Sequence, residues 1–165
     1  MAERRQALWK PIAAAAGAAL TVAFIGGLMT DLGPWYEQLE QPTWQPPDWL
    51  FGPAWTTVFA LTALAGVLAW RKSETREARQ NLLVFFSLNA TLNVTWSLLF
   101  FRLQRPDWAL VEVVLLWLSI VALIVVCSRR STAAGWLLVP YLAWVSFASF
   151  LNYTIVQLNA PFGRS

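Results

Sequence analysis

Five blocks of predominantly apolar residues, separated by short polar or charged segments, set the pattern of this chain of 165 residues. Each block is about twenty residues long, the length of helix that crosses a hydrocarbon layer of about 30 Å. The pattern predicts membrane-spanning helices over residues 12–30, 49–70, 81–101, 108–128 and 135–158. The connections are too short for an extramembrane domain. We therefore expect an all-α membrane protein, a single domain over residues 1–165 folded as a five-transmembrane-helix bundle.

Composition supports this prediction and excludes several kinds of site. Hydrophobic residues make up 58% of the chain and charged residues 13%, about half the usual charged share of a globular protein. The net charge of +3 comes from residues scattered in short loops, which argues against nucleic-acid binding. The chain has no histidine, so we expect no metal site and no ligated haem. Its one cysteine, Cys127, lies in an apolar block and is expected to pack as a small apolar side chain.

The N-terminal segment resembles a signal peptide, because Arg4, Arg5 and Lys10 precede an apolar stretch. That stretch is long enough to span a bilayer, and no small-residue cleavage site closes it before Asp31. We therefore interpret it as a retained first helix.

The basic residues are distributed unequally between the two sides of the predicted bundle. The N-terminal side carries nine of them: Arg4, Arg5, Lys10, Arg71, Lys72, Arg76, Arg79, Arg129 and Arg130. The opposite side carries three: Arg102, Arg105 and Arg164. Because basic loops stay in the cytoplasm, the pattern predicts a cytoplasmic N-terminus and an outside C-terminus. For a bacterial host, the membrane would be the inner one.

Small residues recur along the first predicted helix, with Ala15, Ala19 and Ala23 at intervals of four and Ala14 and Ala18 beside them. Such spacing allows close helix contact in lipid. It fits packing within the bundle and the face of a homodimer equally well.

Polar and aromatic side chains share single faces of three predicted helices. The second helix has Trp55, Phe59, Thr62 and Gly66, the third has Asn89, Asn93, Trp96 and Phe100, and the fifth has Tyr141, Trp144, Ala148 and Leu151. Unpaired carboxamides are costly in lipid, so these faces should point into the bundle. The rings either fill the core or line a cavity for a flat, largely apolar ligand.

Glu112 is the only acid inside the predicted spans apart from their ends. It is either a functional acid or a structural one that reaches interfacial water or the helix dipole.

The first loop, residues 31–48, is rich in proline and aromatic residues. It contains Pro34, Trp35, Tyr36, Pro42, Trp44, Pro46 and Pro47. Proline fixes φ, so the loop loses less entropy when it adopts one shape. We interpret it as a lid over the outer mouth of the bundle; an interfacial anchor is the alternative.

Three sequence blocks resemble the tryptophan-rich sensory protein/translocator protein family (TspO/MBR), which includes the peripheral-type benzodiazepine receptor. They are W-Y-x5-P-x-W-x-P-P over residues 35–47, L-N-x-x-W-x-x-x-F-F over residues 92–101, and P-Y-L-A-W over residues 140–144. Trp55 follows the first block, Trp108-Ala-Leu the second and Leu151-Asn-Tyr the third.

The resemblance implies a homodimeric five-helix bundle in the lipid bilayer that binds porphyrins such as protoporphyrin IX, with no required cofactor. It implies binding of cholesterol-like and benzodiazepine-like ligands as well. Carried over by position, the ligand-binding residues are Tyr36, Pro46, Trp55, Phe59, Asn93, Trp96, Trp108, Trp144, Ala148 and Leu151. The cholesterol-recognition pattern of the animal proteins is incomplete, because no Lys or Arg occurs in residues 154–158.

Three functions follow as expectations. The first is a receptor or sensor for tetrapyrroles and related planar apolar ligands, acting in the stress response to them. The second is an enzyme for light- and oxygen-dependent porphyrin degradation, with Trp55 and Trp144 as the candidate catalytic residues; no conventional catalytic constellation is present. The third is a porphyrin or sterol transporter, which five spans without internal repeats do not favour.

Overall fold

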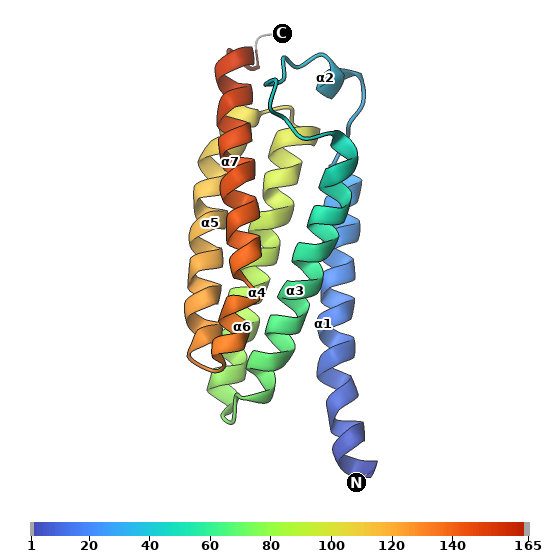
Figure 1. Ribbon diagram of the computed structural model, residues 1–165, viewed down its shortest axis with the longest axis vertical. Coiled ribbons are helices and arrows are strands. Elements are labelled where there is room, and N and C mark those ends of the chain that lie inside the picture. Colours follow the sequence, from blue (N-terminus) through green and yellow to red (C-terminus); the bar gives the residue numbers. More distant parts are fainter. Residues whose placement is uncertain (1, 164–165) are drawn as a thin grey trace.

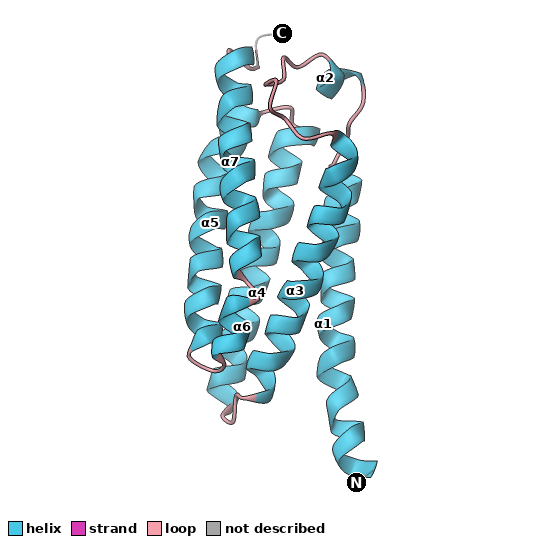
Figure 2. Cartoon of the chain, in the orientation of Figure 1, coloured by secondary structure: helices cyan, strands magenta, loops and turns pink. Residues whose placement is uncertain are grey.

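A computed structural model describes residues 2–163, with side chains at residue 9 and from residue 11 onward. The side chains of Arg4, Arg5 and Lys10, and the whole of Arg164, lie outside the described residues, so their part in the predicted topology is not visible. The described chain is helical, with no strand, and short loops join the helices (Figure 2).

The long helices are α1 (Ala2–Met29), α3 (Phe51–Arg71), α4 (Arg76–Ser97), α5 (Pro106–Ser128) and α7 (Val139–Asn159). Short elements are α2 (Pro34–Glu37), the 3₁₀ turn η1 (Asp48–Leu50), the π-helical turn η2 (Leu98–Arg102) and α6 (Thr132–Trp136). Five segments are long and apolar enough to cross a membrane: Pro11–Met29, Asp48–Arg71, Arg76–Arg102, Pro106–Ser128 and Thr132–Asn159. The predicted five-helix bundle is confirmed.

Local chemistry explains two differences from the predicted spans. The third span begins at Arg76 rather than 81, because the Thr75 side chain accepts a hydrogen bond from the Ala78 N–H at 3.1 Å and caps the helix. The fifth span is broken between α6 and α7, where Pro140 lies at the start of α7. Proline has no N–H to continue a preceding helix, so it favours a new helix start there.

The bundle has two distinct ends (Figure 1). The N-terminus and the connections α3–α4 and α5–α6 lie at one end, here called the N-terminal end. The first loop with α2, the turn between η2 and α5, and the C-terminus lie at the other end, here called the lid end.

Three clusters of buried side chains fill the bundle. The cluster near the N-terminal end contains Leu82, Leu123 and Cys127, so the cysteine packs as the small apolar residue that its context predicts. The second cluster has Ile120, Tyr141 and Val145 at its centre. The third, at the lid end, has Tyr36, Phe100 and Leu151. None of the buried members of these clusters comes from α1, which is the peripheral helix of the bundle.

Arg102 attaches the end of α1 to η2. Its Nε and Nη2 atoms donate to the Leu28 carbonyl oxygen at 3.2 and 2.7 Å, and its Nη1 lies 3.9 Å from a carboxylate oxygen of Asp31. The last carbonyls of a helix have no partner within the helix, so this guanidinium caps α1 at its C-terminus.

Replacing Arg102 with Ala should loosen the end of α1 without affecting the rest of the bundle. The lost cap is worth about 1 kcal/mol, so amide exchange in residues 26–32 should become about fivefold faster, as measured by hydrogen–deuterium exchange mass spectrometry in detergent. Exchange in α5 should stay unchanged. The exposed Arg130, replaced with Ala, is the matched control; equal effects of both variants would contradict the capping role.

Candidate ligand-binding site

The predicted faces of α3 and α7 meet in one aromatic cluster, here called the α3–α7 cluster. Trp55 stacks on Phe59 with ring centroids 5.4 Å apart. The edge of the same indole meets Trp144 at 6.4 Å and Tyr141 at 6.2 Å. Trp144 also contacts Phe51 at 5.7 Å. Edge-to-face and offset pairs of this kind add to the area that they bury, so Phe51, Phe59 and Tyr141 hold the Trp55 and Trp144 rings in fixed positions.

A second cluster joins α4 and η2 to the first loop, and is here called the α4–lid cluster. Trp96 stacks on Phe100 at 5.2 Å and meets Phe101 at 6.0 Å. Tyr36 lies 5.8 Å from Phe101, and Trp35 lies 6.2 Å from Phe100. The first loop therefore reaches into the bundle and supplies two of the rings at its lid end.

Two indole groups in these clusters have an unpaired N–H. The Nε1 atoms of Trp96 and Trp144 are buried, and no acceptor lies within hydrogen-bonding distance in the described residues. Trp117, in contrast, donates from its Nε1 to Ser146 Oγ at 2.9 Å. A buried donor without an acceptor costs about 1–3 kcal/mol, so the two orphaned N–H groups need an explanation.

A network of amide, phenol and hydroxyl groups crosses the middle of the bundle. Asn93 Nδ2 donates to the Tyr141 hydroxyl at 3.0 Å, and that hydroxyl donates to Asn89 Oδ1 at 3.3 Å. Asn89 Nδ2 donates to Ser119 Oγ at 2.8 Å. The network joins α4, α5 and α7, and both carboxamides are buried, as their position in a lipid-embedded helix predicted.

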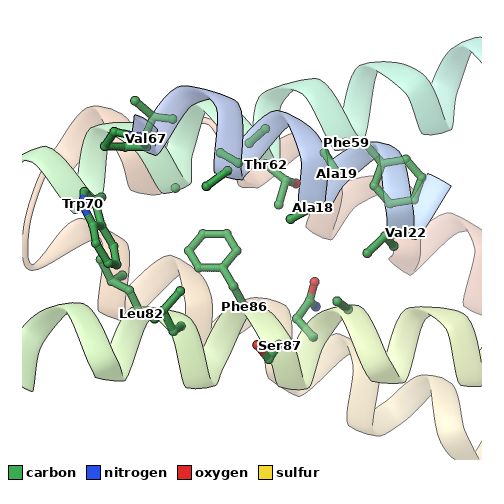
Figure 3. Close-up of a pocket in the computed structure, with 18 of the residues that line it drawn as sticks. Ala18, Ala19, Val22, Phe59, Thr62, Val67, Trp70, Leu82, Phe86 and Ser87 are labelled. Atoms are coloured by element: carbon green, nitrogen blue, oxygen red, sulfur yellow. The ribbon is translucent and has the colours of Figure 1, made fainter. Parts of the chain in front are cut away.

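Beside this network lies a cavity of about 610 Å³ between α1, α3 and α4. Figure 3 shows it with Trp70 and Leu82 at one end, Phe59 and Val22 at the other, and the Phe86 ring between them. Alanines of α1 form one wall. No charged residue lines it among the side chains that the structure describes. We call it the inner cavity.

The ten predicted ligand-binding residues occupy three environments. Phe59 and Asn93 line the inner cavity. Tyr36, Trp55, Trp96, Trp144 and Leu151 pack in the core and aromatic clusters nearer the lid end, and Pro46 and Ala148 are half-buried. Trp108 is 51% exposed, and the Arg105 guanidinium lies 4.1 Å from its ring centroid. The described structure therefore places Trp108 apart from the other nine.

Some lining residues of the inner cavity could have been found from the sequence. Thr62 and Gly66 belong to the predicted α3 face, and Ala15, Ala18 and Ala19 to the predicted α1 pattern. Phe86 was missed, although it lies seven residues before Asn93 and so on the same helical face. Trp70 was missed as well, because a tryptophan next to Arg71 is typical of the interface.

Polar contacts within the first loop, the predicted lid, hold it in shape. Gln45 Nε2 donates to Gln41 Oε1 at 2.8 Å and to the Tyr36 hydroxyl at 3.2 Å. Asp48 Oδ1 lies 3.4 Å from the same hydroxyl. Burial, with the nearby Asp48 charge, raises the pKa of Tyr36 to about 12. The phenol therefore stays neutral at physiological pH and remains a donor for Asp48.

One residue of α7 fastens the lid to the bundle. Asn159 Oδ1 accepts from the Glu40 N–H at 2.7 Å, and Asn159 Nδ2 donates to the Glu40 carbonyl at 2.8 Å. The two bonds form a closed amide pair between the loop and the last residue of the helix. Trp44 of the lid contacts α7 as well, because its ring stacks on Phe150 at 5.1 Å and meets Phe147 edge-on at 6.1 Å.

Glu112 is buried on α5, with 7% of its surface exposed and neither carboxyl oxygen hydrogen-bonded within the described residues. Its carboxyl oxygens are buried and so do not reach interfacial water, which is one of the two structural roles that the sequence allowed. Helices α4 and α5 run in opposite directions, and Asn89 pairs with Ser119. Trp96 and Glu112 each lie seven residues closer to the lid end, and so at the same depth, about 10 Å from that pair.

The two basic residues that the structure describes at the lid end already have protein partners. Arg102 is bound to the end of α1, as described above, and Arg105 forms a two-bond ion pair with Asp107. Neither guanidinium lines the inner cavity.

Fold and site together define a small multi-pass helical membrane protein, with aromatic clusters under a lid and an interior cavity. A sequence profile of the TspO/MBR family matches residues 14–158. The chain belongs to the TspO/MBR family.

Individual relatives agree with this assignment. The chain is 47% identical to the tryptophan-rich protein TspO of Chlorobaculum tepidum, over 87% of this chain and 92% of the relative. It is 33% identical to protein CrtK of Rhodobacter capsulatus, over 81% and 83% of the two chains. It is 34% identical to the human translocator protein, over 76% and 75%. The relationship therefore covers all five spans and extends from bacteria to animals.

Replacing Asn159 with Ala should release the lid, because both bonds to the Glu40 backbone are lost. Two hydrogen bonds are worth about 2 kcal/mol, so amide exchange in residues 34–48 should become at least about tenfold faster by hydrogen–deuterium exchange mass spectrometry. Asn81, exposed at the opposite end, serves as the Asn→Ala control. Unchanged exchange in the lid would show that its other contacts, including Trp44 on Phe150, hold it without the amide pair.

Proposed function

We propose that this protein is a membrane receptor that binds a planar, largely apolar ligand of the tetrapyrrole class beneath the lid, with protoporphyrin IX as the ligand to test. The observation that carries the proposal is the pair of buried, unpaired indole N–H groups of Trp96 and Trp144. They come from α4 and α7 and belong to the two aromatic clusters. A ligand that brings acceptors between them would satisfy both donors.

A tetrapyrrole fits the chemistry of this region in two respects. Its flat faces can stack on the Trp55 and Trp96 rings, whose neighbours already pack in stacked or edge-on geometry. Its carboxylate groups are strong acceptors for an indole N–H. Arg102 and Arg105 already have partners, so recognition would depend on the indoles rather than on these two cations.

A metal-free porphyrin suits the sequence better than haem does. The chain contains no histidine, and histidine is the usual axial ligand of haem iron in oxygen-binding proteins. The relatives include a tryptophan-rich sensory protein and a translocator protein, and both names fit a receptor whose occupancy is read by another component.

We further infer that the N-terminal end of the bundle faces the cytoplasm and the lid faces outward, in the inner membrane of a bacterial host. Arg71 ends α3 at the N-terminal end, and Lys72, Arg129 and Arg130 lie in the connections there, whereas the lid has no basic residue. Basic loops are retained on the cytoplasmic side.

Removing the two indole N–H groups while keeping aromatic rings should weaken porphyrin binding. A Trp96→Phe/Trp144→Phe variant loses two hydrogen bonds to the ligand, so the Kd for protoporphyrin IX should rise at least about tenfold. The measurement is a titration of purified protein followed by the porphyrin absorption band. Trp117→Phe, whose N–H is bonded to Ser146, should bind as wild type does. Unsaturable binding to wild type, or equal Kd values in all three proteins, would refute the proposal.

Light-dependent breakdown of the bound porphyrin is a second candidate function. It is favoured by the contact between Trp55 and Trp144, whose ring centroids lie 6.4 Å apart within the proposed site. Both indole rings would lie against a macrocycle bound in this site and could donate an electron to its excited state, with dioxygen as the oxidant of the breakdown.

Illuminated, air-saturated protein should then bleach the porphyrin band faster than protein-free detergent does. Trp55→Phe and Trp144→Phe should each slow the bleaching toward the protein-free rate. Trp136→Phe, 68% exposed and in α6 at the N-terminal end, should not. Equal bleaching with and without protein would leave binding as the sole function.

A further inference from the structure

The inner cavity begins beside the aromatic site under the lid, because Phe59 and Tyr141 of the α3–α7 cluster line it, and it extends from there toward the N-terminal end. It extends along α3 from Phe59 to Trp70 and along α4 from Leu82 to Asn93. Each of these stretches covers eleven residue steps, or about 16 Å of helix. The cavity is therefore a long slot parallel to the helices, and Figure 3 shows the Phe86 ring lying along its middle.

The slot opens toward the surrounding lipid between α1 and α4. Ala14 and Ala18 of α1 and Leu83 and Ser87 of α4 line it and are exposed on the surface of the bundle. Helix α1 contributes only small residues to this part of the wall, which leaves room between the helices. A molecule dissolved in the bilayer can therefore enter sideways.

Polar side chains line the middle of the slot and its end nearer the lid, and they include Thr62 and Ser87. Asn89, Asn93 and Tyr141 lie at the end nearer the lid, whereas the opposite end is formed by Val67, Leu82, Leu83 and Trp70. Asn93 is buried, with 4% of its surface exposed, and its Nδ2 donates to the Tyr141 hydroxyl. Its Oδ1 lacks a donor in the part of the chain that the structure describes. Thr62, which also lines the slot, has a buried Oγ1 without a hydrogen-bond partner in the described residues. The slot thus offers two free acceptors, Asn93 Oδ1 and Thr62 Oγ1.

The absence of charge among the described lining side chains restricts the ligand further. A carboxylate or phosphate buried there would have no counter-ion, at a cost of several kcal/mol. A tetrapyrrole carboxylate in the slot would lack even the indole donors proposed for it under the lid, since neither Trp96 nor Trp144 lines the slot. An uncharged molecule with one hydrogen-bond donor is therefore the better occupant.

We propose that the inner cavity is a second ligand site, which takes an uncharged long-chain amphiphile from the bilayer. Its single hydroxyl group donates to Asn93 Oδ1, and its chain runs past Phe86 to Trp70. This orientation is head-inward, opposite to that of a lipid in the adjoining leaflet.

Photolabelling of the full-length protein in lipid nanodiscs tests both the site and the orientation. The probe is a sixteen-carbon alcohol with a diazirine at its methyl end, and the labelled peptides are identified by mass spectrometry. The expected labels lie on the segments around Trp70 and Leu82, and excess unlabelled hexadecanol should remove them. Saturable label on the segments around Phe59 and Asn93 would reverse the orientation and overturn the head-group assignment.

Variants on one helix separate the slot from the lipid-facing surface. Ala63 lines the slot and Ala60, one turn earlier on α3, is exposed outside it. Ala63→Phe should reduce the saturable label at least about fivefold, whereas Ala60→Phe should leave it unchanged. Equal labelling of both variants would mean that the probe contacts only the outer surface.

A pair of ligands tests the hydrogen bond without any substitution. Hexadecanol should compete for the wild-type site about fivefold better than hexadecyl methyl ether, because the ether cannot donate to Asn93 Oδ1 and one hydrogen bond is worth about 1 kcal/mol. Equal competition by the two would overturn the head-group assignment even if Ala63→Phe failed to fold.

Protoporphyrin binding distinguishes this site from the one proposed under the lid. Ala63→Phe should keep the wild-type Kd for protoporphyrin IX while it loses the alcohol probe. A parallel loss of both ligands would show that they share one site and would refute a separate inner-cavity site. Loss of porphyrin binding in Trp96→Phe/Trp144→Phe, with labelling intact, would support both.

Discussion

In the hydrocarbon interior of a bilayer, a side-chain amide without a partner costs several kcal/mol, and α4 carries two of them, Asn89 and Asn93. The structure meets this cost with one network, in which the Tyr141 hydroxyl accepts from Asn93 and donates to Asn89, while Asn89 donates to Ser119. These bonds fix the rotation of α4 relative to α5 and α7. Because Trp96 and Phe86 lie on the same side of α4 as the amides, the same constraint decides which rings face the interior.

Helix α1 takes no part in this hydrogen-bond network. It supplies none of the buried residues of the three core clusters. At its C-terminal end, the Arg102 guanidinium donates a hydrogen bond to the Leu28 carbonyl and so attaches the helix to η2. A helix held by small-residue contacts and one end cap can move relative to the rest of the bundle at little cost. The inner cavity lies against this helix, whereas the aromatic clusters lie between helices that the network and the core hold together.

Much of the fold could be predicted from the sequence, because membrane thickness fixes span length and the cost of unpaired amides fixes which face is interior. Residues 31–48 were recognisable as a stiff loop for the same kind of reason, since proline restricts φ. Pro140 could have indicated the break between α6 and α7, but its effect depends on whether the neighbouring segment packs as one helix or two.

Positions that depend on tertiary geometry could not be predicted. Helical spacing alone does not say whether a ring at a helix start faces inward or outward, and Trp108 lies outward beneath Arg105. Nor does spacing reveal that the N–H groups of Trp96 and Trp144 lack acceptors while that of Trp117 has one. Hydrogen-bond partners come from other helices, and their distances follow only from the assembled bundle.

The pair formed by Glu40 and Asn159 joins residues 119 positions apart in a chain of 165. A chain is synthesised from its N-terminus, so four spans can be in the membrane before the lid has the residue that fastens it. The aromatic site is likewise incomplete until Tyr141 and Trp144 arrive with the last helix. Competence to bind under the lid is therefore acquired at the final step of biogenesis, and a prematurely terminated chain would insert into the membrane without it.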